Sequence, residues 1–341
     1  MNHVISALEE KRFFKLVCGA SLTDTQMIEN LCCIFTLAGA HVIDLAPTAD
    51  VIFAARKGIS SALQLSSSLV PQLCPMLMAS IQLDKDPHFR KIEVDYDTCD
   101  LCGACVEVCP TEAFKIERAG ESEDKRTGRK FKYSSERCYG CGVCPSYCHV
   151  SALKMIDTKP TPKETLKEMI SLGIKSIEFH FGENYQKLNE IWDEIKDLVK
   201  ELDLLSFSIG SGLLSKPDIK KAANLCYKLA GKGIILQCDG TPMSGGIKNK
   251  GNNTDNPSFE VAKIIQGEKL PVYLQISGGT NQNSFLWAIE AGLTINGVAI
   301  GSYARKILMP YLKNLNQENI NQVVEIAKSL VNSTGSTFVT I

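Results

Sequence analysis

The chain has 341 residues, a formal net charge of −1 at pH 7 and 44% hydrophobic residues, and this length can bury a large core and a second small one. The balanced charge does not indicate a surface that binds nucleic acid. No apolar run is long enough to cross a bilayer or to form a secretory signal. We therefore expect a cytoplasmic globular protein with no nucleic-acid partner and no transmembrane segment.

The first 84 residues alternate short apolar runs with segments of helical periodicity. The pattern predicts strands at 14–20, 41–46 and 76–83, and helices at 24–38 and about 48–63. Residues 1–84 are assigned to the first part of an α/β barrel domain, with three strand-helix units.

Residues 85–158 are dominated by cysteine. Eight of the 14 cysteines form two runs of the spacing C-x2-C-x2-C-x3-C. The runs are Cys99, Cys102, Cys105 and Cys109, and then Cys138, Cys141, Cys144 and Cys148. The first run ends in Cys109-Pro110, which is typical of bacterial ferredoxins with a pair of 4Fe-4S clusters. His149 stands where a second such proline is expected, and we interpret it as a surface residue. We predict an inserted α+β ferredoxin-like domain.

The spacing also predicts which cysteines share a cluster. Three thiolates two residues apart can surround one cluster, while the fourth, three residues further on, reaches the other cluster. We expect one cluster on Cys99, Cys102, Cys105 and Cys148, and the other on Cys138, Cys141, Cys144 and Cys109. Zinc and disulfides are the alternatives to clusters, and both are less favoured. Zinc usually takes two separated C-x2-C pairs and does not need the third and fourth cysteines of each run, and disulfides need an oxidising compartment, for which the sequence gives no indication. The other six cysteines are interpreted as small buried hydrophobes.

The strand-helix alternation resumes in residues 159–341. Strands are predicted at 175–181, 204–209, 234–239, 271–277 and 298–301, and helices at about 162–172, 184–202, 217–229, 258–266, 281–291 and 304–331, with a glycine- and asparagine-rich loop at 240–256. Eight strands and eight helices fit a TIM-type (β/α)8 barrel. A doubly wound sheet is the alternative, because alternation specifies only the α/β class. In a barrel, the cysteine module would lie between the third strand and the third helix, at the catalytic end.

Polar residues alternate with apolar ones along the predicted barrel strands. The apolar face must meet the helices, so the polar set points into the barrel. This set comprises Asp44, Ser80, Gln82, Glu178, His180, Ser206, Ser208, Gln237, Asp239, Gln275 and Ser277. It forms either a pocket for a polar ligand or an internal hydrogen-bonded network. Glu178, His180 and Asp239 are candidate ligand-binding residues, and the first two could serve acid-base chemistry or form a structural pair.

Glycine-rich turns end the last two predicted strands. Gly278, Gly279 and Thr280 follow the seventh strand, and Gly301 and Ser302 follow the eighth. In a barrel, these two loops commonly present backbone N–H groups to a phosphate. FMN or another phosphate ligand would suit this site, although glycine also serves turns that bind nothing.

Several segments beside the cysteine module carry a more specific likeness. They are FKLVCGAS at 14–21, DGTPMSG at 239–245, GGTN at 278–281 and GVAIGSYARK at 297–306. With the double cysteine module, they resemble the LdpA family of cyanobacterial light-dependent period proteins. The resemblance implies a cytoplasmic iron-sulfur protein that senses the state of cellular electron carriers and modulates the circadian clock.

Two functions remain open from the sequence. The first, which we favour on the family resemblance, is a redox-sensing electron-transfer protein whose partners are a redox protein or small electron carrier and circadian clock proteins. The second is an oxidoreductase that passes electrons from the two clusters to a flavin or a small polar substrate at the barrel mouth. No catalytic residue is assigned, because no residue dictates a reaction.

Overall fold

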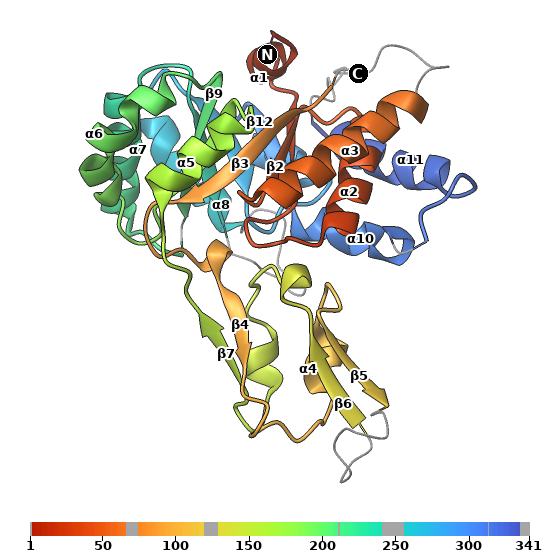
Figure 1. The fold of residues 1–341 in the computed structure, drawn as a ribbon. Coiled ribbons are helices and arrows are strands. Elements are labelled where there is room, and N and C mark those ends of the chain that lie inside the picture. The colour runs from red at the N-terminus through yellow and green to blue at the C-terminus, as the bar shows by residue number, and fades with distance from the viewer. Residues whose placement is uncertain are drawn as a thin grey trace.

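A closed barrel of eight parallel strands forms the body of the molecule (Figure 1). The computed structural model describes residues 2–65, 74–118, 129–210, 212–240, 256–312 and 314–334. In spatial order the strands are β1 (Phe13–Val17), β12 (Gly297–Ile300), β11 (Tyr273–Ser277), β10 (Ile235–Asp239), β9 (Leu204–Gly210), β8 (Ser176–His180), β3 (Met76–Gln82) and β2 (Val42–Leu45). The predicted (β/α)8 barrel is confirmed, and the doubly wound alternative is wrong because the sheet closes on itself.

Helices surround the barrel and cover the apolar face of its strands. They are α2 (Thr25–Leu37), α3 (Ala49–Leu65), α5 (Pro162–Ser171), α6 (Lys187–Val199), α7 (Lys216–Ala230), α8 (Pro257–Gly267), α9 (Ser284–Glu290), α10 (Ser302–Leu312) and α11 (Ile320–Val331). Outward-facing strand residues such as Ile177, Phe179 and Phe207 are fully buried in the core between barrel and helices. The predicted glycine- and asparagine-rich loop lies outside the described residues from 241 to 255.

The prediction of one helix over 304–331 is wrong, because α10 and α11 are separate helices. Asparagine side chains stabilise the turn between them. Asn316 Oδ1 accepts the backbone N–H groups of Glu318 and Asn319 at 2.9 and 3.1 Å. Such side-chain acceptors satisfy backbone donors outside a helix, and here they hold the turn that leads into α11.

An additional helix, α1 (Asn2–Glu9), closes the amino-terminal end of the barrel. Its Val4, Ala7 and Leu8 pack with Phe13 and Met78 in a small apolar cluster. We did not predict this helix, because it precedes the strand-helix alternation. Among the described residues this apolar cluster covers one end of the barrel, and the polar residues of the interior open toward the opposite end.

The cysteine module extends from that opposite end (Figure 1). It lies between β3 and α5 and consists of two antiparallel pairs, β4 (Lys91–Val94) with β7 (Leu153–Ile156) and β5 (Phe114–Arg118) with β6 (Arg129–Tyr133). One short helix, α4 (Ala104–Val108), and the 3-10 turns η1 (Pro87–Phe89), η2 (Ser135–Arg137) and η3 (Cys144–Tyr147) complete it. The module is therefore inserted after the third barrel strand, as predicted.

Polar contacts fix the module against the first strand-helix loop of the barrel. Arg137 Nε lies 2.9 Å from Asp24 Oδ2, and both groups are largely buried. The backbone N–H groups of Thr23 and Asp24 donate to the carbonyl of Glu136 at 2.8 and 3.0 Å. These bonds hold the second cysteine run directly over the barrel mouth.

Five of the six cysteines outside the module are buried, as expected for small hydrophobic residues, but Cys74 is exposed.

Within the described part of the chain, no helix has the length and apolar character needed to cross a membrane.

Candidate functional site

The eight module cysteines gather around two cavities. Cys99, Cys102, Cys105 and Cys148 line the first cavity, and Cys109, Cys138, Cys141 and Cys144 line the second. Each run thus supplies three cysteines to one cavity and one cysteine to the other. This is the grouping that we expected from the spacing.

The two halves of the module repeat each other in backbone conformation. Gly103 and Gly142, each one residue after the second cysteine of its run, have φ of 85° and 71°. Glu112 and Ser151, each three residues after the fourth cysteine, have φ of 52° and 57°. Residues other than glycine rarely adopt positive φ, so the matched pair indicates that the loop geometry is imposed by the cysteine spacing.

Backbone hydrogen bonds to sulfur follow the same repeat. The N–H of Ala113 donates to Cys109 Sγ at 3.2 Å, and the N–H of Ala152 donates to Cys148 Sγ at 3.2 Å. These bonds hold the two crossing cysteines in place. Hydrogen bonds to ligating sulfurs are also one of the factors that set cluster potentials.

The donor chemistry of both cavities fits a 4Fe-4S cluster, which takes four cysteine thiolates. The other residues that line the second cavity include Ile92, Phe114 and Val143, which offer no competing metal ligand. Cys99, Cys102, Cys105 and Cys148 would hold one cluster, and Cys109, Cys138, Cys141 and Cys144 the other. Each cluster, when bound, supplies one-electron transfer. His149 lies at the surface and contacts Asp100 Oδ2 at 2.9 Å, as expected for a residue outside the ligand set.

A polar pocket opens at the barrel mouth beneath the module. All eight predicted ligand-binding residues line it: Glu178, His180, Asp239, Gly278, Gly279, Thr280, Gly301 and Ser302. The structure therefore brings these residues together, whereas binding of FMN or another phosphate ligand stays a prediction. Gly278 also has a packing role, because with φ of +73° an added Cβ would lie 2.6 Å from the backbone N of Gly240.

Below the pocket the polar strand residues form a hydrogen-bonded network. Glu178 accepts from Ser206 Oγ at 2.7 Å and from Gln237 Nε2 at 2.9 Å. Gln237 in turn accepts from Gln275 at 2.7 Å. The deeper polar residues thus bond to one another, as expected for an internal network, and the upper ones face the pocket, for which a polar ligand stays a prediction.

Lys15 is a buried charged residue of the barrel interior that the sequence analysis did not identify. Its fully buried ammonium group forms an ion pair with Glu178 inside the barrel. Burial opposes ionisation of Glu178, but the charges of Lys15 and His180 outweigh it and hold the Glu178 pKa well below its ordinary value. The pattern contained the clue, because Lys15 stands between Phe14 and Leu16 in β1 and alternation turns it inward.

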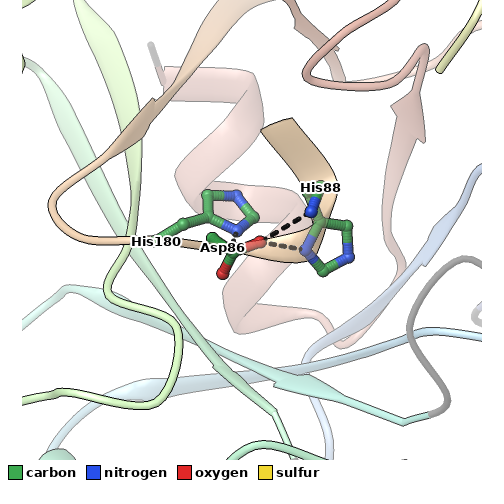
Figure 2. A group of neighbouring side chains, drawn as sticks. All are labelled: Asp86, His88 and His180. Carbon is green, nitrogen blue, oxygen red and sulfur yellow. Dashed lines mark hydrogen bonds and ion pairs between the residues drawn. The ribbon is translucent and has the colours of Figure 1, made fainter. Parts of the chain in front are cut away.

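Asp86 and His88 were also missed, because they follow β3 in a loop without a recognisable motif. Asp86 Oδ1 is 2.6 Å from His88 Nδ1, and Asp86 Oδ2 is 3.9 Å from His180 Nδ1 (Figure 2). Burial lowers the His88 pKa, but the Asp86 carboxylate outweighs it and raises the pKa to about 9. Asp86, His88 and His180 thus meet at the edge of the pocket.

Tyr139 and Arg305 connect the module to the pocket. Tyr139, next to Cys138, lines both the second cysteine cavity and the barrel pocket. The Arg305 guanidinium lies 4.4 Å from the centre of the Tyr139 ring, a cation–π contact. Its Nη1 donates to the carbonyls of Val17 and Cys18 at 2.6 and 2.7 Å. Neither side chain could be predicted from sequence, because their meeting depends on how the module docks.

Two family comparisons cover most of the barrel's second half and the module. Residues 168–336 match the Light dependent period A C-terminal domain, and residues 98–152 match the 4Fe-4S dicluster domain. The dicluster domain indicates two 4Fe-4S clusters, as predicted from the spacing.

Comparison with individual proteins gives one relative along nearly the whole chain. Light dependent period A from Synechococcus elongatus is 29% identical over 327 residues, 92% of this chain and 86% of that protein. NADH-quinone oxidoreductase subunit I 2 of Geobacter metallireducens is 36% identical over 59 residues, 16% of this chain and 44% of that protein. The YdjI aldolase of Escherichia coli K12 aligns in structure with a TM-score of 0.46 and 9% identity, covering 97% of this chain and 92% of that chain. The resemblance predicted from the sequence is confirmed.

Paired cysteine substitutions test how the two runs share their cavities. In Cys109→Ala/Cys138→Ala both changes fall in the second cavity, so we expect one cluster to remain, with about four iron ions per chain. In Cys99→Ala/Cys109→Ala each cavity loses one ligand, so we expect both clusters to be lost. Iron analysis and electron paramagnetic resonance after anaerobic purification measure the outcome. The reverse pattern would show that each run holds its own cluster.

Removing Lys15 tests the buried network. Lys15→Met leaves the Glu178 carboxylate without its cation, so we expect a loss of about 3 to 5 kcal/mol in the free energy of unfolding. The double variant Lys15→Met/Glu178→Gln removes both charges and should recover much of that loss. Urea denaturation of cluster-loaded protein measures both. A single variant as stable as the parent would show that the ion pair contributes little.

Proposed function

Because the chain is a relative of Light dependent period A and carries a 4Fe-4S dicluster domain, we propose that it is a cytoplasmic, redox-responsive electron-transfer protein. In this proposal a change of charge in the barrel pocket affects the cluster of the second cysteine cavity, and a change of charge on that cluster affects the pocket. The clusters would exchange electrons with a redox protein or a small electron carrier, and the response would modulate the input to a circadian clock. The clock role rests on family likeness alone.

The observation that carries the proposal is the position of Tyr139 between the two sites. Tyr139 lines the cavity of Cys109, Cys138, Cys141 and Cys144, and it also lines the barrel pocket. Tyr139 is only 3% exposed, so bulk water does not separate the two sites at this point. A change of charge at either site would therefore be felt at the other with little screening.

Arg305 is the residue best placed to couple the two sites. It lines the pocket and stacks on Tyr139, and two backbone carbonyls anchor its Nη1. Its buried Nε has no hydrogen-bond partner among the described residues. A fixed cation with a free donor would suit an anionic ligand in the pocket, and its charge would also favour the reduced state of a nearby cluster.

The first cysteine cavity is the natural point of contact with a redox partner. The first cavity has one exposed cysteine, Cys102, and one buried cysteine, whereas the second cavity has two buried cysteines, Cys138 and Cys144, and no exposed one. None of the described residues that line the first cavity also lines the barrel pocket. A partner would thus exchange electrons at the first cavity, through its exposed Cys102, and the second cavity would face the pocket.

The oxidoreductase is the second candidate, favoured by the titratable groups of the pocket. Asp44, His88, Glu178, His180 and Asp239 all line it, next to the second cysteine cavity. Burial raises the Asp44 pKa to about 6, which gives the pocket a group that can exchange a proton near neutral pH. Flavin content separates the candidates, because FMN released on denaturing anaerobically purified protein would favour the enzyme.

Substitution of Arg305 tests the coupling. Arg305→Gln removes a positive charge beside the second cavity, so we expect the midpoint potential of one cluster to fall by roughly 60 mV, while the other stays unchanged. Redox titration followed by electron paramagnetic resonance measures both potentials.

Arg56→Gln is the matched control, because Arg56 donates to the carbonyl of Leu172 on the outside of the barrel. It should leave both potentials unchanged. If Arg305→Gln also leaves both potentials unchanged with the clusters fully loaded, the two sites are not coupled through this residue.

A further inference from the structure

We propose that Asp86, His88 and His180 form a binding site for one divalent transition-metal ion at the edge of the barrel pocket (Figure 2). The site is separate from the two cysteine cavities and does not depend on the proposed redox role. One potential ligand atom from each residue lies within 4.8 Å of the others. Figure 2 shows the Asp86 carboxylate between the two imidazole rings.

The three residues come from neighbouring strand ends that are held rigidly together. The N–H of Leu83 donates to the carbonyl of His180 at 2.7 Å, which joins the end of β3 to the end of β8. Gly182 packs so closely that an added Cβ would lie 2.0 Å from the carbonyl oxygen of Lys85. The loop that carries Asp86 therefore has little freedom to move away from His180.

His180 is the observation that points to a ligand. The residue is only 3% exposed, and its Nε2 contacts Glu178 Oε1 at 3.3 Å, whereas its buried Nδ1 has no hydrogen-bond partner among the described residues. Buried polar atoms in proteins are nearly always satisfied, so the unpaired Nδ1 needs an explanation. A metal ion on Nδ1, the nitrogen that faces Asp86 Oδ2 at 3.9 Å, would supply it.

A purely structural interpretation accounts for only part of the group. Asp86 caps the short turn η1 by accepting the backbone N–H of His88 at 2.8 Å, and it also contacts the ring of His88. That interpretation explains Asp86 and His88. It leaves His180 facing the same carboxylate without a hydrogen bond.

The surroundings of His180 resemble those of a metal-ligating histidine. Its Nε2 lies 3.3 Å from Glu178 Oε1, and Glu178 is itself held by Lys15, Ser206 and Gln237. Ligating histidines commonly face a carboxylate through the second ring nitrogen, which fixes the tautomer and the orientation of the ring. Here that carboxylate is anchored by the network below the pocket.

The ligand set selects the class of ion. Two imidazole nitrogens and one carboxylate suit zinc, iron, cobalt or manganese, whereas calcium and magnesium prefer oxygen ligands. Asp86 and His180 are buried, but the side chain of His88 is 20% exposed and lines the pocket. A bound ion would therefore keep open positions toward the pocket, where it could polarise an oxygen atom of a small molecule.

Zinc binding to the full cluster-loaded chain tests the site, with Zn²⁺ alone as the probe. We expect calorimetry to show one ion per chain. Zinc X-ray absorption should show nitrogen and oxygen neighbours at about 2.0 to 2.2 Å and no sulfur at about 2.3 Å. Asp86→Asn and His180→Gln should each weaken binding by more than about tenfold.

His149→Gln is the matched control, because His149 belongs to an exposed group with Asp100 and Cys102 that could also attract a metal ion. It should leave zinc affinity unchanged. Iron content and circular dichroism show which variants are folded and carry their clusters. If a variant fails this check, His88→Asn takes its place, because the His88 side chain is partly exposed and its replacement disturbs the fold least. The proposal would be overturned if the parent protein bound no zinc or if the zinc ion had sulfur neighbours. It would also be overturned if Asp86→Asn and His180→Gln bound zinc as tightly as the parent does.

Discussion

The exchange of one cysteine between the two runs is the constraint on which the module depends. Cys109 leaves its own run for the second cavity, and Cys148 leaves its run for the first. Neither half can then hold four sulfurs without the other, so the strands and turns between them must bring both halves together. The residues with positive φ and the backbone N–H bonds to sulfur occur at matching positions, so both halves place their crossing cysteine with the same local structure.

Insertion into the barrel gives the module a fixed place. Both ends of the insertion meet at the barrel mouth, where Gln82 Nε2 donates to Thr158 Oγ1 at 3.0 Å. The ion pair of Arg137 with Asp24 joins the second cysteine run to the barrel, and Tyr139 of that run is buried. The closeness of the second cavity to the barrel pocket thus follows from chain connectivity and a few buried contacts. A ferredoxin domain on a flexible tether would have no such relation to the barrel.

Strand periodicity and cysteine spacing made most of the architecture predictable. Alternation located all eight barrel strands and turned Glu178, Gln237 and Asp239 inward, because an apolar face must meet the helices. Local sequence could not locate groups that meet only after folding. Asp86 and Tyr139 belong to loops whose positions depend on docking, and the break between α10 and α11 depends on side-chain bonds of two asparagines. Lys15 could have been predicted from the alternation, because a lysine that points into a barrel needs a buried partner.

The central claim is that the eight module cysteines hold two 4Fe-4S clusters at the mouth of the barrel. Iron and acid-labile sulfide, measured together on protein purified without oxygen, test it most directly. We predict about eight iron ions and about eight sulfides per chain, with the broad brown absorbance of such clusters. Iron and sulfide near zero, with zinc coordinated by cysteine sulfur in their place, would contradict the account.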